Sequence, residues 1–278
     1  KLRSILDLLS NISKNHHRTP NFFTKIEQIL LLVKDETTQF FTNFEIFKLF
    51  EGNKRIILFL FEQKILKPDK LIADAVQNGK LFEAKYHVYF FPELNPFYEK
   101  QYKLKLFTET YEFHDYSFDV FNKLRKIGEN DKEFYELIRS DSIDEFVTLV
   151  NKRGFSLSST VQTSLFETNH YLLKHKPKII EYAAFYGAIQ IFRYLYLNEV
   201  DFTPSLWYYV IHGKNPELIH ILEEKGIIPN DSSYEECVDE SIKCYHKEFT
   251  TYIYDNLMQR KSDDDYDISI QGMKYKNY

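Results

Sequence analysis

The chain has 278 residues, of which 44% are hydrophobic and 28% are charged, and this balance is typical of an ordinary folded protein. Only 8 glycines and 8 prolines interrupt it, which disfavours a sandwich or barrel with many tight turns and favours helices. The net charge of −5, without a long Lys/Arg block, argues against nucleic acid as a partner. The longest apolar runs, 29–33 and 56–61, are too short to span a bilayer, so we expect no membrane insertion.

The two cysteines, Cys237 and Cys244, are too few for a disulfide framework in a chain of this size. They favour a reducing intracellular compartment, and we expect the cytoplasm. The 25 phenylalanines and 21 tyrosines could suggest a surface on which bases or sugars stack. Lysine, asparagine and isoleucine are abundant too, which favours a compositional drift across the whole gene. The aromatic content therefore predicts no ligand.

A five-residue apolar pattern recurs along the chain: two apolar residues, a spacer, and two more apolar residues. Four copies, and a weaker one with threonine at its second apolar position, occupy 56–60, 146–150, 191–195, 218–222 and 249–253. This spacing covers a stripe of a helix that is wide enough to pack against two neighbours. One helix pair cannot bury such a stripe, whereas stacked copies can. The pattern predicts an all-α solenoid of stacked helix–turn–helix repeats.

Residues 177–195 indicate how one repeat is built. Ala183 and Ala184 are small at the place where the first helix of a repeat would approach its neighbour closely. Gly187 suits a left-handed residue that ends this first helix. Pro177 lies near the expected helix start. The stretch therefore predicts a helix, a tight turn and a second helix, and not one long helix.

These repeats resemble divergent ankyrin repeats. The paired alanines, the glycine three residues later and the segment 216–226 fit the second helix and closing glycine of that family. The closest copies are 27 residues apart (190 to 217) and 31 apart (217 to 248), against about 33 in ankyrin repeats. The Thr-Pro-Leu-His tetrapeptide of the family is absent, and an insertion at 155–177 lengthens another interval.

The chain is also similar, over residues 6 to about 256, to a large family of uncharacterised ankyrin-type proteins expanded in some protists. The similar blocks, in the same order, are 6–30, 41–65, 125–147, 156–160, 179–185, 203–224 and 233–244. This resemblance implies the solenoid fold with an N-terminal helical cap. It implies no catalytic residues.

The domain organisation that we expect follows from these blocks. The chain divides into an N-terminal helical cap, degenerate repeats with an aromatic insertion, ankyrin-like repeats and an exit segment, at 1–45, 46–130, 131–260 and 261–278. Within the second segment, residues 73–84 suggest a decayed first helix that ends at Gly79. Residues 86–118 have no clear helical period, so we expect a loop or insertion packed by its own aromatic side chains.

One histidine group points to an enzyme as the alternative. His114 and Asp115, with His87 upstream, are typical of the metal-binding pair of helical phosphohydrolases, which need a further histidine and a distant aspartate. The dyad lies in the aromatic, non-periodic stretch, and the chain has no Gly-rich phosphate loop, nucleophile elbow or HExxH motif. We therefore predict no enzyme, and keep a helical metal-dependent hydrolase as the alternative.

Three further patterns favour structural roles. The adjacent histidines in 15–18 point in different directions on a helix and suit a helix end or surface turn. Cys237 and Cys244 are seven residues apart, unlike the closer pairs of zinc sites, which favours two buried small side chains. The acidic segment 262–267 lacks the glycine and closing glutamate of a calcium loop. We predict no cofactor and no metal ion.

The predicted function is a non-catalytic protein–protein interaction scaffold. Ankyrin stacks usually bind partners along a concave face built from the first helices, and tyrosine suits hot spots of binding energy. The first-helix residues predicted to contact the unidentified protein partner are Glu181, Tyr182, Tyr186, Tyr208, Tyr209 and His212. The same positions could instead belong to the core of a degenerate repeat. A domain that positions another domain of a longer protein is a further alternative.

Overall fold

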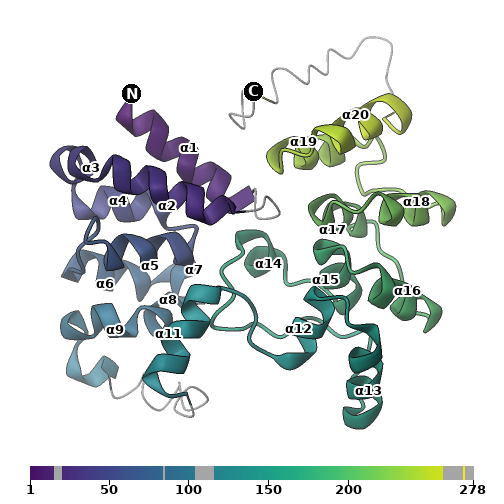
Figure 1. Ribbon diagram of the computed structural model, residues 1–278, viewed down its shortest axis with the longest axis horizontal. Helices are drawn as coiled ribbons and strands as arrows, with labels where there is room; N and C mark the ends of the chain where they lie inside the picture. Colours follow the sequence, from purple (N-terminus) through teal and green to yellow (C-terminus); the bar gives the residue numbers. More distant parts are fainter. Residues whose placement is uncertain (16–20, 84, 104–115, 259–271, 273–278) are drawn as a thin grey trace. The chain divides into compact units, whose positions relative to one another are not determined.

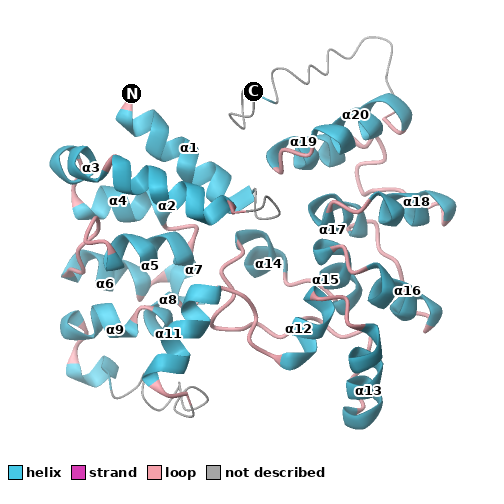
Figure 2. Cartoon of the chain, viewed as in Figure 1, coloured by secondary structure: helices cyan, strands magenta, loops and turns pink. Residues whose placement is uncertain are grey.

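The computed structural model describes residues 1–15, 21–83, 85–103, 116–258 and 272, and this part of the chain is all-α (Figures 1 and 2). It contains nineteen α-helices and one 3₁₀ helix, and the described residues form no strand beyond an isolated bridge between Thr160 and Lys178. None of these helices has both the length and the apolar character needed to cross a bilayer. The all-α class predicted from the sequence is confirmed.

The chain forms two compact units. Unit 1 comprises Lys1–Lys14, Asn21–Asp131 and Thr163–Lys174, and most of unit 2 is formed by Lys132–Gln162 and the chain from His175 onward. The helices of unit 1 are α1 (Leu2–Asn15), α2 (Phe22–Leu32), α3 (Lys34–Phe40), α4 (Asn43–Phe50), α5 (Lys54–Glu62), α6 (Lys70–Val76), α7 (Gly79–Glu83), α8 (Tyr86–Tyr89), α9 (Phe91–Leu94), η1 (Asn95–Phe97), α11 (Phe118–Ile127) and, at its end, α14 (His170–His175). The helices of unit 2 are α12 (Glu133–Arg139), α13 (Ile143–Arg153), α15 (Ile179–Tyr186), α16 (Ile189–Leu197), α17 (Leu206–Gly213), α18 (Pro216–Glu224), α19 (Glu235–Lys243) and α20 (Lys247–Asn256).

The aromatic stretch after residue 85 differs from the loop predicted for it. Residues 86–97 form the three short helices α8, α9 and η1, because their aromatic rings enter the core of unit 1. The ring of Phe90 packs edge-on against Phe61 of α5, with centroids 5.6 Å apart, and the Tyr86 hydroxyl donates to the Glu51 carbonyl. The expected packing among the aromatics of the stretch also occurs, as in the Tyr98–Tyr102 contact at 5.3 Å. Residues 104–115 lie outside the described part.

Two cations, Lys54 and Arg125, are buried among the described residues of unit 1, each with its own partners. The Lys54 ammonium donates to the Leu165 carbonyl (3.0 Å) and lies over the ring of Tyr89. The Arg125 guanidinium makes a two-pronged ion pair with Glu93, at 2.8 and 2.9 Å, and also donates to the Tyr89 carbonyl. Such partners offset part of the desolvation cost, which is severe for an unpaired buried charge.

The same type of turn between two helices occurs four times in unit 2. In each of the helix pairs α12–α13, α15–α16, α17–α18 and α19–α20, one residue with positive φ follows the first helix. These residues are Asp141, Gly187, Lys214 and Tyr245, with φ of 52°, 68°, 54° and 57°. The second helix begins two residues later in every pair. The helix–turn–helix predicted for 177–195 is confirmed, and so is the left-handed Gly187.

The first helices of consecutive pairs contact each other: α12 with α15, α15 with α17, and α17 with α19 (Figure 1). Side chains at the turns connect neighbouring pairs. The Asp141 carboxylate accepts hydrogen bonds from the amides of Gln190 and Ile191 at the start of α16. The Asn215 side chain donates to the Gly187 carbonyl (3.1 Å) and caps its own helix α18. The α12–α13 turn therefore satisfies backbone amides of the following pair, and the α17–α18 turn satisfies a carbonyl of the preceding pair and an amide of its own helix.

The backbones of α15 and α17 approach each other closely. A Cβ atom placed on Gly213 would lie 2.0 Å from the Ala184 carbonyl oxygen, and one on Gly187 would lie 2.8 Å from the Gly213 oxygen. The side chains of α15 from Ile179 to Phe185 are all buried. Small residues at this crossing let the two backbones meet, as the sequence predicts for Ala184.

We expect the substitution Gly213→Ala to lower the free energy of unfolding by about 3 kcal/mol, because the added methyl group must push backbone atoms apart. Chemical denaturation followed by circular dichroism measures this loss. The matched control is Gly226→Ala, where the new Cβ meets no atom within 4 Å and only the positive φ opposes it, at a cost of about 1 kcal/mol. Equal losses in the two variants would contradict the close crossing.

Lys54 predicts a pH dependence of stability. Burial lowers the pKa of its ammonium to about 7, against the opposing effect of Glu167. The unfolded chain, with a pKa of about 10.4, therefore binds a proton that the folded chain lacks between these values. In this window stability rises with pH, by at most about 1.4 kcal/mol per pH unit from this group.

Denaturation between pH 7 and pH 9 should give a steeper rise in stability for the wild type than for Lys54→Met. Lys126→Met, at an exposed lysine on α11, should keep the wild-type slope. Identical slopes for wild type and Lys54→Met would show that the Lys54 ammonium does not titrate in this range.

Candidate functional site

The six residues predicted to contact a partner divide into two groups. Tyr186 and Tyr208 are half-buried, and the other four, Glu181, Tyr182, Tyr209 and His212, are buried. A side chain without exposed area offers no contact surface to a partner. The structure therefore places these four residues in the packed interior, which is the other role that the sequence left open for them. Tyr186 and Tyr208 retain exposed area for the predicted contact.

Glu181 and Tyr182 have structural partners within unit 2. The Glu181 carboxylate accepts a hydrogen bond from the Lys178 amide at the start of α15, and the hydroxyls of Thr203 and Ser205 donate to its other oxygen. The Tyr182 hydroxyl accepts a hydrogen bond from Arg139 of α12 at 3.0 Å. These contacts connect α15 to the preceding helix pair and to the loop that precedes α17.

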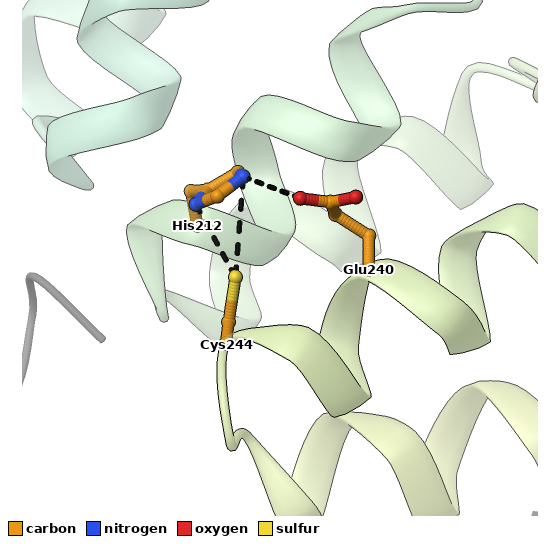
Figure 3. A group of neighbouring side chains, drawn as sticks. All are labelled: His212, Glu240 and Cys244. Carbon is orange, nitrogen blue, oxygen red and sulfur yellow. Dashed lines mark hydrogen bonds and ion pairs between the residues drawn. The ribbon is translucent and has the colours of Figure 1, made fainter. Parts of the chain in front are cut away.

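His212, Glu240 and Cys244 form a cluster of three titratable side chains between α17 and α19 (Figure 3). His212 is the seventh residue of α17, Glu240 lies on α19, and Cys244 is the residue that caps the end of α19. The Nε2 atom of His212 lies 2.9 Å from Glu240 Oε1. The Cys244 sulfur lies 3.3 Å from Nδ1 and 3.9 Å from Nε2 of the same ring. We call this group the His–Glu–Cys cluster.

Neighbouring groups stabilise the ionised form of the Glu240 carboxyl. Burial raises the pKa of its carboxyl, but the hydrogen bond and charge of His212 and the ammonium of Lys243 outweigh burial and bring the pKa down to about 2. Lys243 Nζ lies 2.8 Å from Glu240 Oε2, so each carboxylate oxygen has its own cationic or donor partner. The carboxylate is therefore ionised at neutral pH and fixed in orientation.

The order of groups in the His–Glu–Cys cluster is that of a thiol, a base and an orienting carboxylate, as in cysteine nucleophiles. Two observations argue against this role. The sulfur is at similar distances from both ring nitrogens, which places it over the imidazole face and not in line with the lone pair of Nδ1 (Figure 3). Cys244 is also buried, and burial raises the pKa of its thiol. The arrangement does not provide an activated thiolate.

Sequence reasoning did not find this cluster. It predicted His212 as a partner contact, with the core as the other possibility, and considered Cys244 only beside Cys237, as one of two buried small side chains. Both cysteines are buried, as predicted. The available signal was the spacing of Glu240 and Cys244, which are four apart and so share one face of a helix. The contribution of His212 depends on the contact of α17 with α19, which only the fold reveals.

Of the three residues of the alternative hydrolase, the structure describes His87 alone. His87 is buried in α8, where its ring packs against Tyr102 and its carbonyl accepts from the Tyr98 hydroxyl. His114 and Asp115 lie outside the described residues. The adjacent histidines at 16–17 and the acidic segment 262–267 also lie outside them. The hydrolase remains an untested alternative.

Comparison with models of known protein families, with curated proteins and with solved structures finds no match to this chain.

The pKa of Glu240 predicts an acid-dependent loss of stability. Its folded value of about 2 lies below the value of about 4.3 in the unfolded chain, so its contribution is complete above the unfolded value and is lost as the pH falls toward 2. We expect Glu240→Gln to show a shallower loss of unfolding free energy between pH 5 and pH 2 than the wild type, by up to about 3 kcal/mol.

Urea denaturation at a series of pH values tests this expectation. Glu235→Gln, at an exposed position on the same helix, is the matched control and should follow the wild-type curve. If Glu240→Gln also follows that curve, the ion pairs of Glu240 with Lys243 and His212 do not contribute to stability.

Proposed function

We propose that this protein is a non-catalytic scaffold that binds another protein through an ankyrin-like solenoid in unit 2. The observation that carries the proposal is the fourfold recurrence of the same turn, with a left-handed residue two positions before each second helix. The contacts between consecutive first helices support stacking of the pairs in register. Repeats that contact only their neighbours build extended surfaces, which such proteins use for binding.

The fold of unit 2 favours recognition by a preformed surface. The first helices α15 and α17 are fixed by buried contacts along most of their length, so binding would require little ordering of the backbone. Tyr186 and Tyr208 are the predicted contact residues that keep exposed area, and tyrosine supplies contact area with few rotors to freeze. We propose that they contribute to the partner-binding face.

The likeness to divergent ankyrin proteins of protists belongs to the same proposal. We also propose that the protein is located in the cytoplasm. The free, buried thiols of Cys237 and Cys244 support a reducing compartment. A role in positioning another domain of a longer protein would use the same surface.

Affinity capture from a lysate of the source cell, with this protein as bait, would identify a partner. Measuring the affinity of the purified partner for the wild type and for variants then tests the proposal. We expect a reproducible protein partner to bind the wild type and to bind Tyr186→Ala/Tyr208→Ala at least about tenfold more weakly, as expected when hot-spot side chains are truncated. The reference variant is Leu32→Ala/Phe40→Ala, which removes two strongly exposed apolar side chains of unit 1 and should bind normally. Circular dichroism confirms that both variants are folded.

Loss of binding in the unit 1 variant alone would move the partner to unit 1 and refute the assigned face. Absence of a partner, combined with turnover of phosphate esters that depends on His87, would instead favour the hydrolase alternative.

A further inference from the structure

The His–Glu–Cys cluster contains three donor atoms of the kinds that bind transition metals. An imidazole nitrogen, a carboxylate oxygen and a cysteine sulfur are all established ligands of Zn²⁺. The donor atoms of His212, Glu240 and Cys244 all lie within 4.8 Å of one another, and within the described part of the chain this is the group of three such residues that could hold an ion. His212 lies four residues after Tyr208 on α17, so the cluster is next to this residue of the partner-binding face proposed above.

The spacing along α19 is suited to a shared ion. Glu240 and Cys244 are four residues apart, and Cys244 has the helical backbone angles φ −78° and ψ −5°. Two side chains with this spacing project from the same face of a helix, which is how helical motifs present two ligands to one metal. His212 provides the third donor from α17, so the ligands are held by two helices in contact.

Changes in distance and in ring orientation would let the donor atoms surround an ion. Metal–ligand bonds of zinc place the donor atoms of a tetrahedral site roughly 3.4–3.6 Å apart. The separation of His212 Nε2 from the Cys244 sulfur is 3.9 Å, and its separation from Glu240 Oε1 is 2.9 Å. An ion that enters between them would shorten the first distance and lengthen the second, in both cases by less than about 1 Å. Because the sulfur lies over the face of the ring, the imidazole must also turn so that the lone pair of Nε2 points toward the ion. The separation of the sulfur from the carboxylate, which is within 4.8 Å, must shorten to about 3.6 Å.

Charge balance also favours a divalent ion. On binding, the Cys244 thiol would release its proton to solvent and become a thiolate, since metals bind the deprotonated form. The thiolate and the Glu240 carboxylate together carry two negative charges, which balance a dication, and the imidazole binds as the neutral form. The site would then bury no net charge of its own, and the Lys243 ammonium would stay paired with Glu240 Oε2.

The surroundings provide support and access. Lys243 orients the carboxylate as an outer-shell partner, and the ring of Phe185 stacks on the His212 imidazole at 5.0 Å. The Glu240 side chain is 12% exposed, so the carboxylate side of the cluster reaches solvent and gives an ion a path of entry. Three protein ligands leave the fourth position of a tetrahedral ion to a water molecule.

We propose that His212, Glu240 and Cys244 bind one Zn²⁺ ion, which joins α17 to α19. The mixed nitrogen, oxygen and sulfur donors select Zn²⁺ over Mg²⁺ and Ca²⁺, which take oxygen ligands. This site clamps two consecutive helix pairs and requires no partner protein.

Titration of the metal-free, reduced chain with CoCl₂ and then ZnCl₂ tests the site. Co²⁺ occupies zinc sites and shows a sulfur-to-metal charge-transfer band in the near ultraviolet when a thiolate is bound. We expect this band to saturate at one equivalent and to disappear when Zn²⁺ displaces Co²⁺. Cys244→Ser should abolish the band and weaken Zn²⁺ binding by more than about 100-fold, above the range that loss of an outer-shell partner costs.

The matched control is Cys237→Ser, which removes the other buried cysteine of α19 and should keep both the band and the zinc affinity. Glu240→Gln should keep the band with weaker binding, because the sulfur ligand remains. Circular dichroism verifies that each variant is folded, and the wild-type titration stands alone if one is not. Absence of the band in the wild type, its persistence in Cys244→Ser, or its loss in folded Cys237→Ser would each overturn the proposal.

Discussion

The crossing of α15 over α17 is the constraint on which unit 2 depends. The backbone of Gly213 lies so close to the Ala184 carbonyl that no side chain fits between them, and Gly187 meets the Gly213 oxygen on the same side. The two helices meet closely here, and the side chains of α15 from Ile179 to Phe185 are buried. The crossing also fixes the position of His212, which precedes Gly213 directly, and so determines what Glu240 can reach.

The two units differ in which polar groups they bury and in what these groups bind. Unit 1 buries the cations of Lys54 and Arg125, and each is held by carbonyl groups and aromatic faces or by a carboxylate. In unit 2 the buried Glu181 and the half-buried Asn215 satisfy a backbone amide and a backbone carbonyl of the repeated pairs. In both units the buried polar groups connect elements that are distant in the sequence.

Local patterns in the sequence were sufficient to predict the helix class and the hairpins of unit 2. The turn at Gly187 could be predicted because a glycine after paired alanines has few alternatives, and the apolar stripe of 191–195 defines a packed helix. The same turn at Lys214 and Tyr245 could not be predicted, because these residues adopt positive φ under the control of the surrounding packing.

Side-chain exposure was harder to predict than helix position. Tyr182 and Tyr209 carry hydroxyl groups and occupy first-helix positions that are exposed in regular repeats, yet they are buried. The burial of Tyr182 follows from the aromatic packing around α15, in which Tyr135 and Tyr186 contact its ring. The His–Glu–Cys cluster was missed for a related reason, since one of its members comes from a different helix.

A partner-binding scaffold in unit 2 would require a stack of helix pairs in which each pair contacts only its neighbours. Such a stack would present a rigid surface to a partner, and a metal ion at the His–Glu–Cys cluster would strengthen the junction of its last two pairs. Both ideas require that the pairs are structural repeats with separable stabilities. A single cooperative core with accidental turns would support neither of them.

Native-state hydrogen exchange at increasing denaturant concentration tests this requirement most directly. If the pairs are stacked repeats, the amides of α19 and α20 at the end of the array should open at a lower free energy than those of α15 and α17, which have neighbours on both sides. If the amides of all four pairs instead open together, with the same free energy and the same dependence on denaturant, unit 2 is one indivisible core and the account of a repeat scaffold is wrong.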